Sequence, residues 1–223
     1  MKTPPPNESI SEGSLLWEPS NGIKSRSNIS SYINWLGAER NLRFGQYDDL
    51  WEWSVENIEE FWGSIWDYFS VKSSSPYTRV ISQQDMPNTQ WFEGSQLNYA
   101  EHALRRHDDH PAIKSKSEIR PLTTISYAEL YERVGAIAAG LKRLGVKKDD
   151  RVAVLMPNIP ETVIAFLAVS SLGATWSACS PEFGTRSVVD RFRQIEPKIL
   201  LAVDGYRYGG RDFHKLEAII EIQ

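Results

Sequence analysis

The sequence predicts an α/β protein in which a helical, aromatic-rich N-terminal extension precedes the first part of a mainly parallel, doubly wound sheet. One observation is that six of the eight tryptophans lie in the first 66 residues. The other is that apolar runs of strand length alternate with amphipathic stretches of helical length beyond residue 110. Together they predict a disordered tail over 1–14, the extension over 15–110 and an α/β domain over 111–223.

Apolar residues at helical spacing predict three helices in the extension. The first runs from Asn28 to Arg40. The second runs from Ser54, its expected N-cap, to Phe69 and carries a single apolar stripe rich in aromatic residues. The third begins near Ser95 and ends by His107, and a polar loop over 73–90 precedes it. Aromatic residues at helical spacing usually pack in a core, so the stripe favours packing over a ligand cage.

The second region predicts repeated β-α units. Residues 111–115 and 120–125 are expected to form a short antiparallel pair. Ser126 and Glu129 have the spacing of a capping box, which opens a helix that Gly145 closes. The parallel strands are expected at 152–156, 174–179 and 199–203, and the helices that follow them at 161–172, at 185–196 and from Phe213 onward.

The loops that follow parallel strands gather at one edge of the sheet, where ligands of such folds bind. Here these loops are 157–160, 180–184 and 204–211. Gly209, Gly210 and Arg211 are the best phosphate candidates, because glycine N–H groups allow close approach, a helix is expected to follow, and arginine pairs with phosphate. An ordinary glycine-rich turn with a solvated arginine explains the same residues equally well. No loop contains GxGxxG or GxxxxGK[ST], so a self-contained nucleotide site is not predicted.

Composition argues against several classes of function. Lys and Arg number 25 against 29 Asp and Glu, and this negative balance disfavours binding to nucleic acid. No apolar run is long enough for a membrane span, and the N-terminus lacks the apolar segment of a signal peptide. The single cysteine, Cys179, supports neither a disulfide framework nor a metal cluster, and the cytoplasm is the expected compartment.

Several segments resemble the adenylate-forming acyl-CoA synthetases. They are Trp91–Glu101, Lys147–Asn158 and Ser171–Ala174, and the aromatic helix resembles the extra N-terminal segment of the acetyl-CoA synthetase branch. Within that branch, Cys179–Gly184 and Gln194–Arg211 resemble the acetoacetate–CoA ligases. The fold that this resemblance implies is the first part of an adenylate-forming N-terminal domain.

The resemblance implies an acid–thiol ligase that uses ATP and Mg²⁺ to convert acetoacetate into an acyl-adenylate, and then CoA to form acetoacetyl-CoA, AMP and pyrophosphate. It also implies a partial site for the CoA nucleotide, in which Arg211 approaches the 3′-phosphate and Tyr208 lies near the nucleotide. Tyr208 stands where acetyl-CoA synthetases often carry arginine, which points to stacking in place of charge pairing. The other residues implied for this site are Arg207, Gly209 and Gly210 on one loop, and Ser180, Pro181, Glu182 and Phe183 on the other.

No catalytic and no metal-binding residue is predicted in this chain. The phosphate loop, the later acidic and aromatic motifs and the lysine of the resembled family do not occur before Gln223. The predicted sheet also ends with an unpaired apolar edge, so we expect a fragment that is inactive until joined to the remainder of the same enzyme. Two alternatives stay open, namely a piece of an acetyl- or propionyl-CoA synthetase and a non-catalytic CoA-binding or interaction module.

Overall fold

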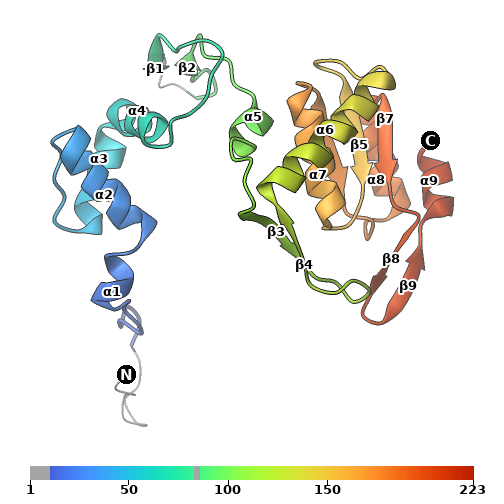
Figure 1. The fold of residues 1–223 in the computed structure, drawn as a ribbon, viewed down its shortest axis with the longest axis horizontal. Helices are drawn as coiled ribbons and strands as arrows, with labels where there is room; N and C mark the ends of the chain where they lie inside the picture. Colours follow the sequence, from blue (N-terminus) through green and yellow to red (C-terminus); the bar gives the residue numbers. More distant parts are fainter. Residues whose placement is uncertain (1–10, 83–85) are drawn as a thin grey trace. The chain divides into compact units, whose positions relative to one another are not determined.

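The computed structural model describes residues 11–82 and 86–223, which divide into two compact units. The first unit comprises Met1–Val71 and Tyr77–Glu93, and the second comprises Lys72–Pro76 and Gly94–Gln223. Figure 1 shows the elements of both units in chain order, from blue to red. The predicted tail over 1–14 lies mostly outside the described residues.

The first unit packs around aromatic side chains, but the core does not use the whole of the predicted stripe, because Trp62 and Phe69 are exposed and Phe61 packs in the core cluster instead. Its elements are α1 (Asn21–Lys24), α2 (Asn28–Glu39), α3 (Tyr47–Glu56), α4 (Ile58–Tyr68) and an antiparallel pair, β1 (Arg79–Ile81) with β2 (Trp91–Glu93). Tyr32 and Leu36 of α2 are buried, and the Tyr32 ring meets Tyr68 of α4 edge to face at 5.1 Å between centroids. The Tyr32 hydroxyl lies 2.6 Å from Ser64 Oγ, which satisfies both buried polar groups.

The long helix expected over 54–69 is wrong, because two shorter helices occupy this region. Ser54 lies inside α3, and the break between α3 and α4 falls at Asn57, whose φ of −120° and ψ of 56° are not helical. The Asn57 side-chain amide donates to the Trp53 carbonyl at 3.3 Å, a local hydrogen bond of the kind that competes with helix continuation. The loop expected over 73–90 likewise contains β1, and the third helix is only α5 (Tyr99–Ala103).

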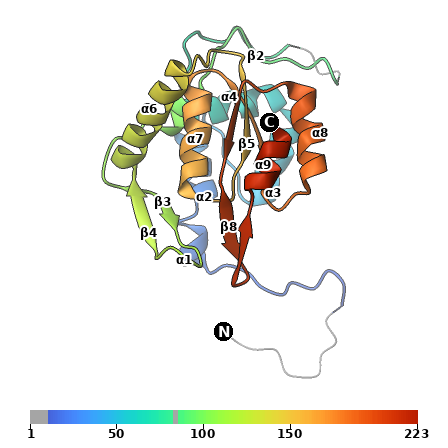
Figure 2. The same ribbon diagram turned by 90° about the vertical axis from the view of Figure 1, so that its right-hand side faces the viewer.

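The second unit contains the predicted parallel sheet. Three strands lie in the order β6 (Thr175–Cys179), β5 (Arg151–Leu155), β7 (Ile199–Ala202), and both pairings are parallel. Four helices cover the sheet: α6 (Tyr127–Arg143), α7 (Pro160–Ser171), α8 (Thr185–Ile195) and α9 (Leu216–Ile222). Figure 2 shows α6 and α7 on one side of β5 and α8 and α9 on the other, which confirms the doubly wound α/β class.

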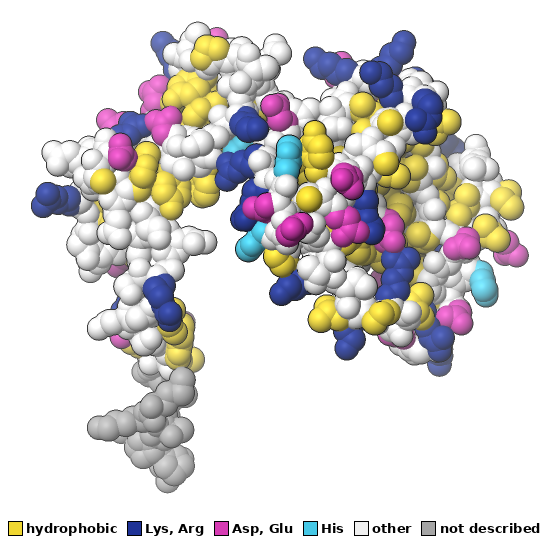
Figure 3. All heavy atoms as spheres, viewed as in Figure 1, with side chains coloured by type: hydrophobic (Ala, Val, Ile, Leu, Met, Phe, Trp, Pro, Cys, Tyr) yellow, Lys and Arg dark blue, Asp and Glu magenta, His cyan; other side chains and the backbone are white. Residues whose placement is uncertain are grey.

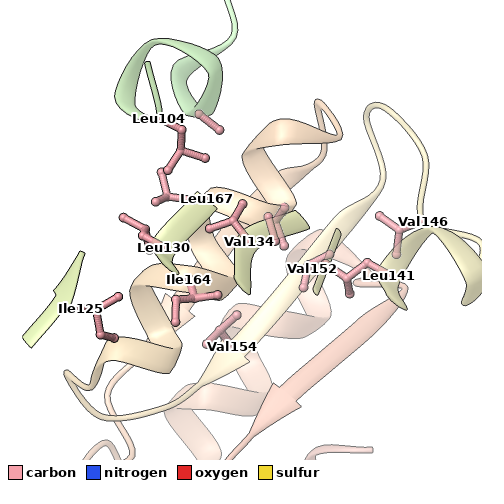
Figure 4. Close-up of a cluster of buried hydrophobic side chains, with 13 residues drawn as sticks. Leu104, Ile125, Leu130, Val134, Leu141, Val146, Val152, Val154, Ile164 and Leu167 are labelled. Atoms are coloured by element: carbon pink, nitrogen blue, oxygen red, sulfur yellow. The ribbon is translucent and has the colours of Figure 1, made fainter. Parts of the chain in front are cut away.

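The alternating side chains of β5 connect the two cores of this unit. Val152 and Val154 face α6 and α7, where they pack with Val134 and Ile164 (Figure 4). Ala153 and Leu155 face the other way and pack with Val188 and Phe192 of α8. Each of these β5 residues is at most 2% exposed, so the central strand is buried on both faces, as parallel sheets require.

Local signals fix the ends of α6 and α7 as the sequence predicts. The Ser126 hydroxyl accepts the Glu129 N–H at 3.2 Å and caps α6. Gly145 ends the helix with a φ of +84°, a conformation that glycine adopts without strain. Pro160 occupies the first turn of α7, where its missing N–H costs nothing. The antiparallel pair β3 (Pro111–Ser115) and β4 (Thr123–Ser126) is also confirmed.

The amino ends of β5 and β7 are held together by Lys198. Its ammonium group donates to the Gly145 carbonyl at 2.6 Å and to Asp150 Oδ2 at 2.8 Å. Asp150 Oδ2 also accepts the Lys147 N–H at 2.7 Å. These hydrogen bonds, first that from Lys198 and then that from Lys147, lower the pKa of the Asp150 carboxyl below its ordinary value.

We expect Asp150→Asn to lower the free energy of unfolding at neutral pH and to lose this effect in acid. A carboxyl whose pKa is lower in the folded state stabilises the fold above its unfolded pKa of about 3.9, and this stabilisation disappears as the pH falls through the folded pKa. Urea denaturation of both proteins at pH 7 and at successive values below pH 4 measures the difference. Asp149→Asn is the matched control, because asparagine tolerates the φ of +67° at position 149. If wild type and Asp150→Asn differed in free energy of unfolding by the same amount at pH 7 and in acid, this account would be contradicted.

Candidate functional site

The loops after the three parallel strands meet at one edge, as the sequence predicts. Leu155 pairs with Cys179 of β6 and with Ala202 of β7, so the last residues of the three strands are aligned. The loop over 180–184 follows β6 and therefore leaves the same edge as the segment that follows β7, with β5 between these two strands. We call the region formed by these two segments the carboxyl edge.

The segment after β7 is an antiparallel hairpin, which corrects the loop expected over 204–211. It also corrects the start of the helix expected from Phe213, because this helix, α9, begins at Leu216. The strands of the hairpin are β8 (Gly205–Tyr208) and β9 (Arg211–His214). Tyr208 pairs with Arg211 across a two-residue turn in which Gly209 and Gly210 have φ of +60° and +74°. Positive φ at both central positions is typical of type I′ turns, for which a Gly-Gly pair is a known signal. The turn does not precede a helix, so no helix dipole acts on it.

The turn already holds an anion in this structure. The Gly209 N–H donates to Oε1 of Glu118 at 2.8 Å, and the Gly210 N–H donates to Oε2 of the same carboxylate at 2.9 Å. Glu118 lies in the loop between β3 and β4, and Figure 1 shows this loop reaching the tip of the hairpin. Sequence reasoning missed Glu118, because 91 positions separate it from Gly209 and no local pattern marks the contact.

Of the cationic and aromatic side chains near the hairpin turn, Arg207 has partners within the hairpin, whereas Arg211 and Tyr208 are exposed. Arg207 donates to the Gly210 carbonyl at 3.3 Å and lies 3.8 Å from Asp212, so it is occupied within the hairpin. Arg211 is exposed and forms no hydrogen bond or ion pair with any residue that the structure describes. The Tyr208 ring is 66% exposed beside it. An exposed guanidinium thus lies next in the chain to two N–H donors that hold a carboxylate.

Tyr206 of β8 contacts aromatic and cationic groups of its own segment, and its phenol is also affected by Glu182 of the loop over 180–184. Its ring stacks on Phe213 with centroids 5.0 Å apart and planes 12° apart, and the Lys215 ammonium lies 5.8 Å from the ring centre. Partial burial raises the pKa of the Tyr206 phenol, and the negative charge of Glu182 raises it further.

The loop over 180–184 exposes only some of its predicted site residues. The Pro181 ring is fully buried and anchors the loop, while the Phe183 N–H closes a turn onto the Ser180 carbonyl at 3.1 Å. Glu182 and Phe183 are exposed, and the guanidinium of Arg191 lies 5.2 Å from the Phe183 ring centre. Glu182 and Phe183 are therefore accessible to a ligand in this chain, whereas the Pro181 side chain is not.

A shallow pocket of about 280 Å³ lies between the hairpin and the β3–β4 loop. Tyr206, Phe213 and Leu216 line it on one side, and Ile119 lines it on the other. Figure 3 shows basic, acidic and hydrophobic side chains intermingled on the visible surface around this region. Within 11–82 and 86–223, His, Cys, Asp and Glu side chains form no group of three or more that could hold a metal ion.

Residues 100–222 match the family model described as AMP-binding enzyme, which covers more than half of the chain. The chain belongs to the AMP-binding enzyme family. Residues 47–103 match a second family model, described as the acetyl-coenzyme A synthetase N-terminus. The second match covers α3, α4 and both strands of the first unit, together with α5.

Several acetoacetyl-CoA synthetases resemble this AMP-binding family member. The one from Xenopus tropicalis is 38% identical over 95% of the chain, and the one from Rhizobium meliloti (strain 1021) is 36% identical over 88%. The solved structure from Streptomyces lividans superposes with a TM-score of 0.89 at 40% identity over 94% of the chain. The chain spans 32%, 30% and 33% of the lengths of these three proteins.

No helix in the described part of this AMP-binding family member combines the length and apolar character needed to cross a membrane.

We expect Gly205→Ala to disrupt the hairpin. A Cβ at position 205 would lie 2.7 Å from the Phe213 carbonyl oxygen, so β8 and β9 would have to separate. The cost is roughly 1–3 kcal/mol in free energy of unfolding, as for other overpacked sites. Urea denaturation and hydrogen exchange at the amides of Tyr206 and Phe213, a hydrogen-bonded pair in this register, measure the effect.

Gly184→Ala is the matched control, because a Cβ at position 184 meets no atom within 4 Å and its φ of −61° suits alanine. Because Gly184 is the N-cap of α8 and alanine is a weaker cap than glycine, the effect of this substitution should stay below about 1 kcal/mol, without any change in exchange at the hairpin amides. Equal exchange rates in wild type and Gly205→Ala would show that the hairpin does not depend on the close approach of β8 and β9 at position 205.

Proposed function

We propose that this AMP-binding family member provides the N-terminal part of an ATP-dependent acetoacetate–CoA ligase. The observation that carries the proposal is the likeness to acetoacetyl-CoA synthetases across nearly the whole chain, including a TM-score of 0.89 with a solved one. The reaction joins acetoacetate to CoA and converts ATP to AMP and pyrophosphate. ATP, Mg²⁺ and CoA are the cofactors and cosubstrates that it requires. We assign no catalytic or metal-binding role to a residue of this chain.

We further propose that the carboxyl edge binds the nucleotide end of CoA. The Gly209 and Gly210 N–H groups donate to one carboxylate, which supports an anion-binding role for this turn, and the exposed Arg211 guanidinium adds a donor suited to a phosphate. Tyr208 offers an exposed ring for stacking. Arg207, which is tied to Gly210 and Asp212, stabilises the hairpin.

The loop over 180–184 would meet the adenine side of the same ligand. Glu182 and Phe183 are its exposed side chains, Ser180 closes its turn, and the buried Pro181 fixes its course. The Arg211 guanidinium would then donate to the CoA 3′-phosphate, and the adenine ring would lie between the hairpin and this loop.

An acetyl- or propionyl-CoA synthetase is the second candidate. The match of residues 47–103 to the acetyl-coenzyme A synthetase N-terminus favours it. Thioester formation by the protein that the source gene encodes, measured with acetoacetate, acetate and propionate at equal concentration, distinguishes the two. Preference for acetoacetate supports the first proposal, and preference for acetate or propionate overturns it. Turnover of none of the three, in a protein that binds CoA, would favour a non-catalytic CoA-binding module.

We expect Arg211→Ala to weaken CoA binding about tenfold, the loss typical of one charge-assisted hydrogen bond at a partly solvated site. Because the contact is with the 3′-phosphate, binding of dephospho-CoA should not change. Isothermal titration with both ligands measures the difference. Acetoacetate-dependent ATP–pyrophosphate exchange should stay at the wild-type rate, since CoA takes no part in adenylate formation.

Arg143→Ala, at the exposed end of α6, removes an equal charge away from the carboxyl edge and is the control. An equal loss of CoA and dephospho-CoA binding in Arg211→Ala would reject the phosphate contact. A fall in ATP–pyrophosphate exchange as large as the fall in thioester formation would reject the role of Arg211 in CoA binding.

A further inference from the structure

The Gly209–Gly210 turn presents two N–H groups that point to the same place. A single carboxylate receives both, one oxygen each, at 2.8 and 2.9 Å. Successive N–H groups arranged in this way form a concave site for anions, and the hydrogen bonds are strengthened by the negative charge of the acceptor. The turn is therefore an anion site with an internal occupant, Glu118.

We propose that Glu118 acts as an internal competitor for this turn, and that a phosphate monoester binds there by displacing its carboxylate. The proposal rests on the proposed function in that it takes the 3′-phosphate of CoA as the natural ligand. It adds a residue from the β3–β4 loop to the site, and it makes the affinity for phosphate depend on how firmly Glu118 holds the turn.

Displacement follows from the number of donors and from charge. Both turn N–H groups are already used by Glu118, so a phosphate oxygen cannot take them while the carboxylate stays. Two anions within a few ångströms of each other also repel. A phosphate monoester can replace the carboxylate because it carries up to two negative charges and three acceptor oxygens. Its remaining oxygens are free to accept from Arg211, the next residue in the chain.

The β3–β4 loop can release the turn without losing its own structure. The Ser117 hydroxyl accepts the Arg120 N–H at 3.1 Å, and the Ser117 N–H donates to the Arg120 carbonyl at 3.1 Å. The Arg120 guanidinium also pairs with Glu161 of α7 at 2.7 Å. Glu118 itself is exposed. A rotation of the Glu118 side chain into solvent is therefore enough to open the turn.

Competition of this kind makes the turn selective. A ligand with a single weak charge gains little by replacing a carboxylate that is already tethered nearby. A phosphate monoester gains more, because it also pairs with the Arg211 guanidinium. The preference for CoA over dephospho-CoA would then reflect the contacts of the phosphate with Arg211 and with the turn, reduced by the cost of displacing Glu118.

The test compares Glu118→Gln with wild type by titration with CoA, dephospho-CoA and inorganic phosphate. Without the competing charge, Glu118→Gln should bind CoA and inorganic phosphate about fivefold more tightly, the upper end for one exposed ionic contact. Dephospho-CoA should bind equally to both proteins. Glu132→Gln is the control, because it removes one exposed negative charge from α6 without touching the hairpin.

A second measurement uses the wild-type chain alone. Inorganic phosphate should move the ¹H–¹⁵N resonances of Gly209 and Gly210, and the carboxylate carbon resonance of Glu118 should shift with the same midpoint. Movement of the Arg211 resonances while both glycine amides stay fixed would overturn the proposal. Weaker or unchanged phosphate binding in Glu118→Gln would overturn it as well, since weaker binding means that Glu118 positions the turn.

Failure of the proposed function gives a different pattern. If Glu118→Gln binds inorganic phosphate more tightly but neither protein prefers CoA over dephospho-CoA, the internal competitor stands and the CoA assignment falls. If CoA is preferred over dephospho-CoA equally by both proteins and phosphate affinity does not change, the CoA assignment stands and the internal competitor falls.

Discussion

The structure of the second unit depends on the double burial of β5. A parallel central strand with helices on both sides has to place an apolar side chain at each position, and Val152 to Leu155 do so in sequence. The same alignment brings the last residues of all three strands to one edge. The position of the carboxyl edge is thus a consequence of how the core packs, since the chain must turn wherever the buried strands stop.

At that edge the chemistry comes from short segments whose backbone is unusually constrained. Gly205 has no Cβ, so the Phe213 carbonyl oxygen of β9 can lie close to the backbone of β8 at this position. Gly209 and Gly210 supply two positive φ angles in succession. These constraints leave the turn N–H groups without partners inside the hairpin, so another part of the protein or a ligand has to accept them. The Glu118 carboxylate meets that requirement in this structure.

Sequence reasoning predicted the elements whose signals are local. The caps at Ser126 and Gly145, the parallel strands and the position of α8 follow from patterns a few residues long. It failed at Asn57, where a local side-chain hydrogen bond interrupts the apolar spacing of a longer helix. It also failed at Tyr208–Arg211, because a strand was expected to be followed by a loop and a helix, and the Gly-Gly signal of a type I′ hairpin was overlooked. In the site, glycines and arginines were visible as candidates. The contact with Glu118 was not, because it depends on how two distant loops fold toward each other.

The lysine at position 198 gives the sheet two mechanically different ends. Its ammonium group donates to the Gly145 carbonyl, just after α6, and to the Asp150 carboxylate, just before β5. Because Lys198 itself directly precedes β7, it links three segments. At the opposite end, among the described residues, no ammonium group joins three segments in this way. The contacts there are shorter in range, such as the Val203 N–H on the Leu155 carbonyl and the Thr162 hydroxyl on the Pro157 carbonyl. Strand ends held firmly at one side form a fixed pivot. Small rearrangements of the loops at the other side can then proceed without disturbing the packed layers behind them.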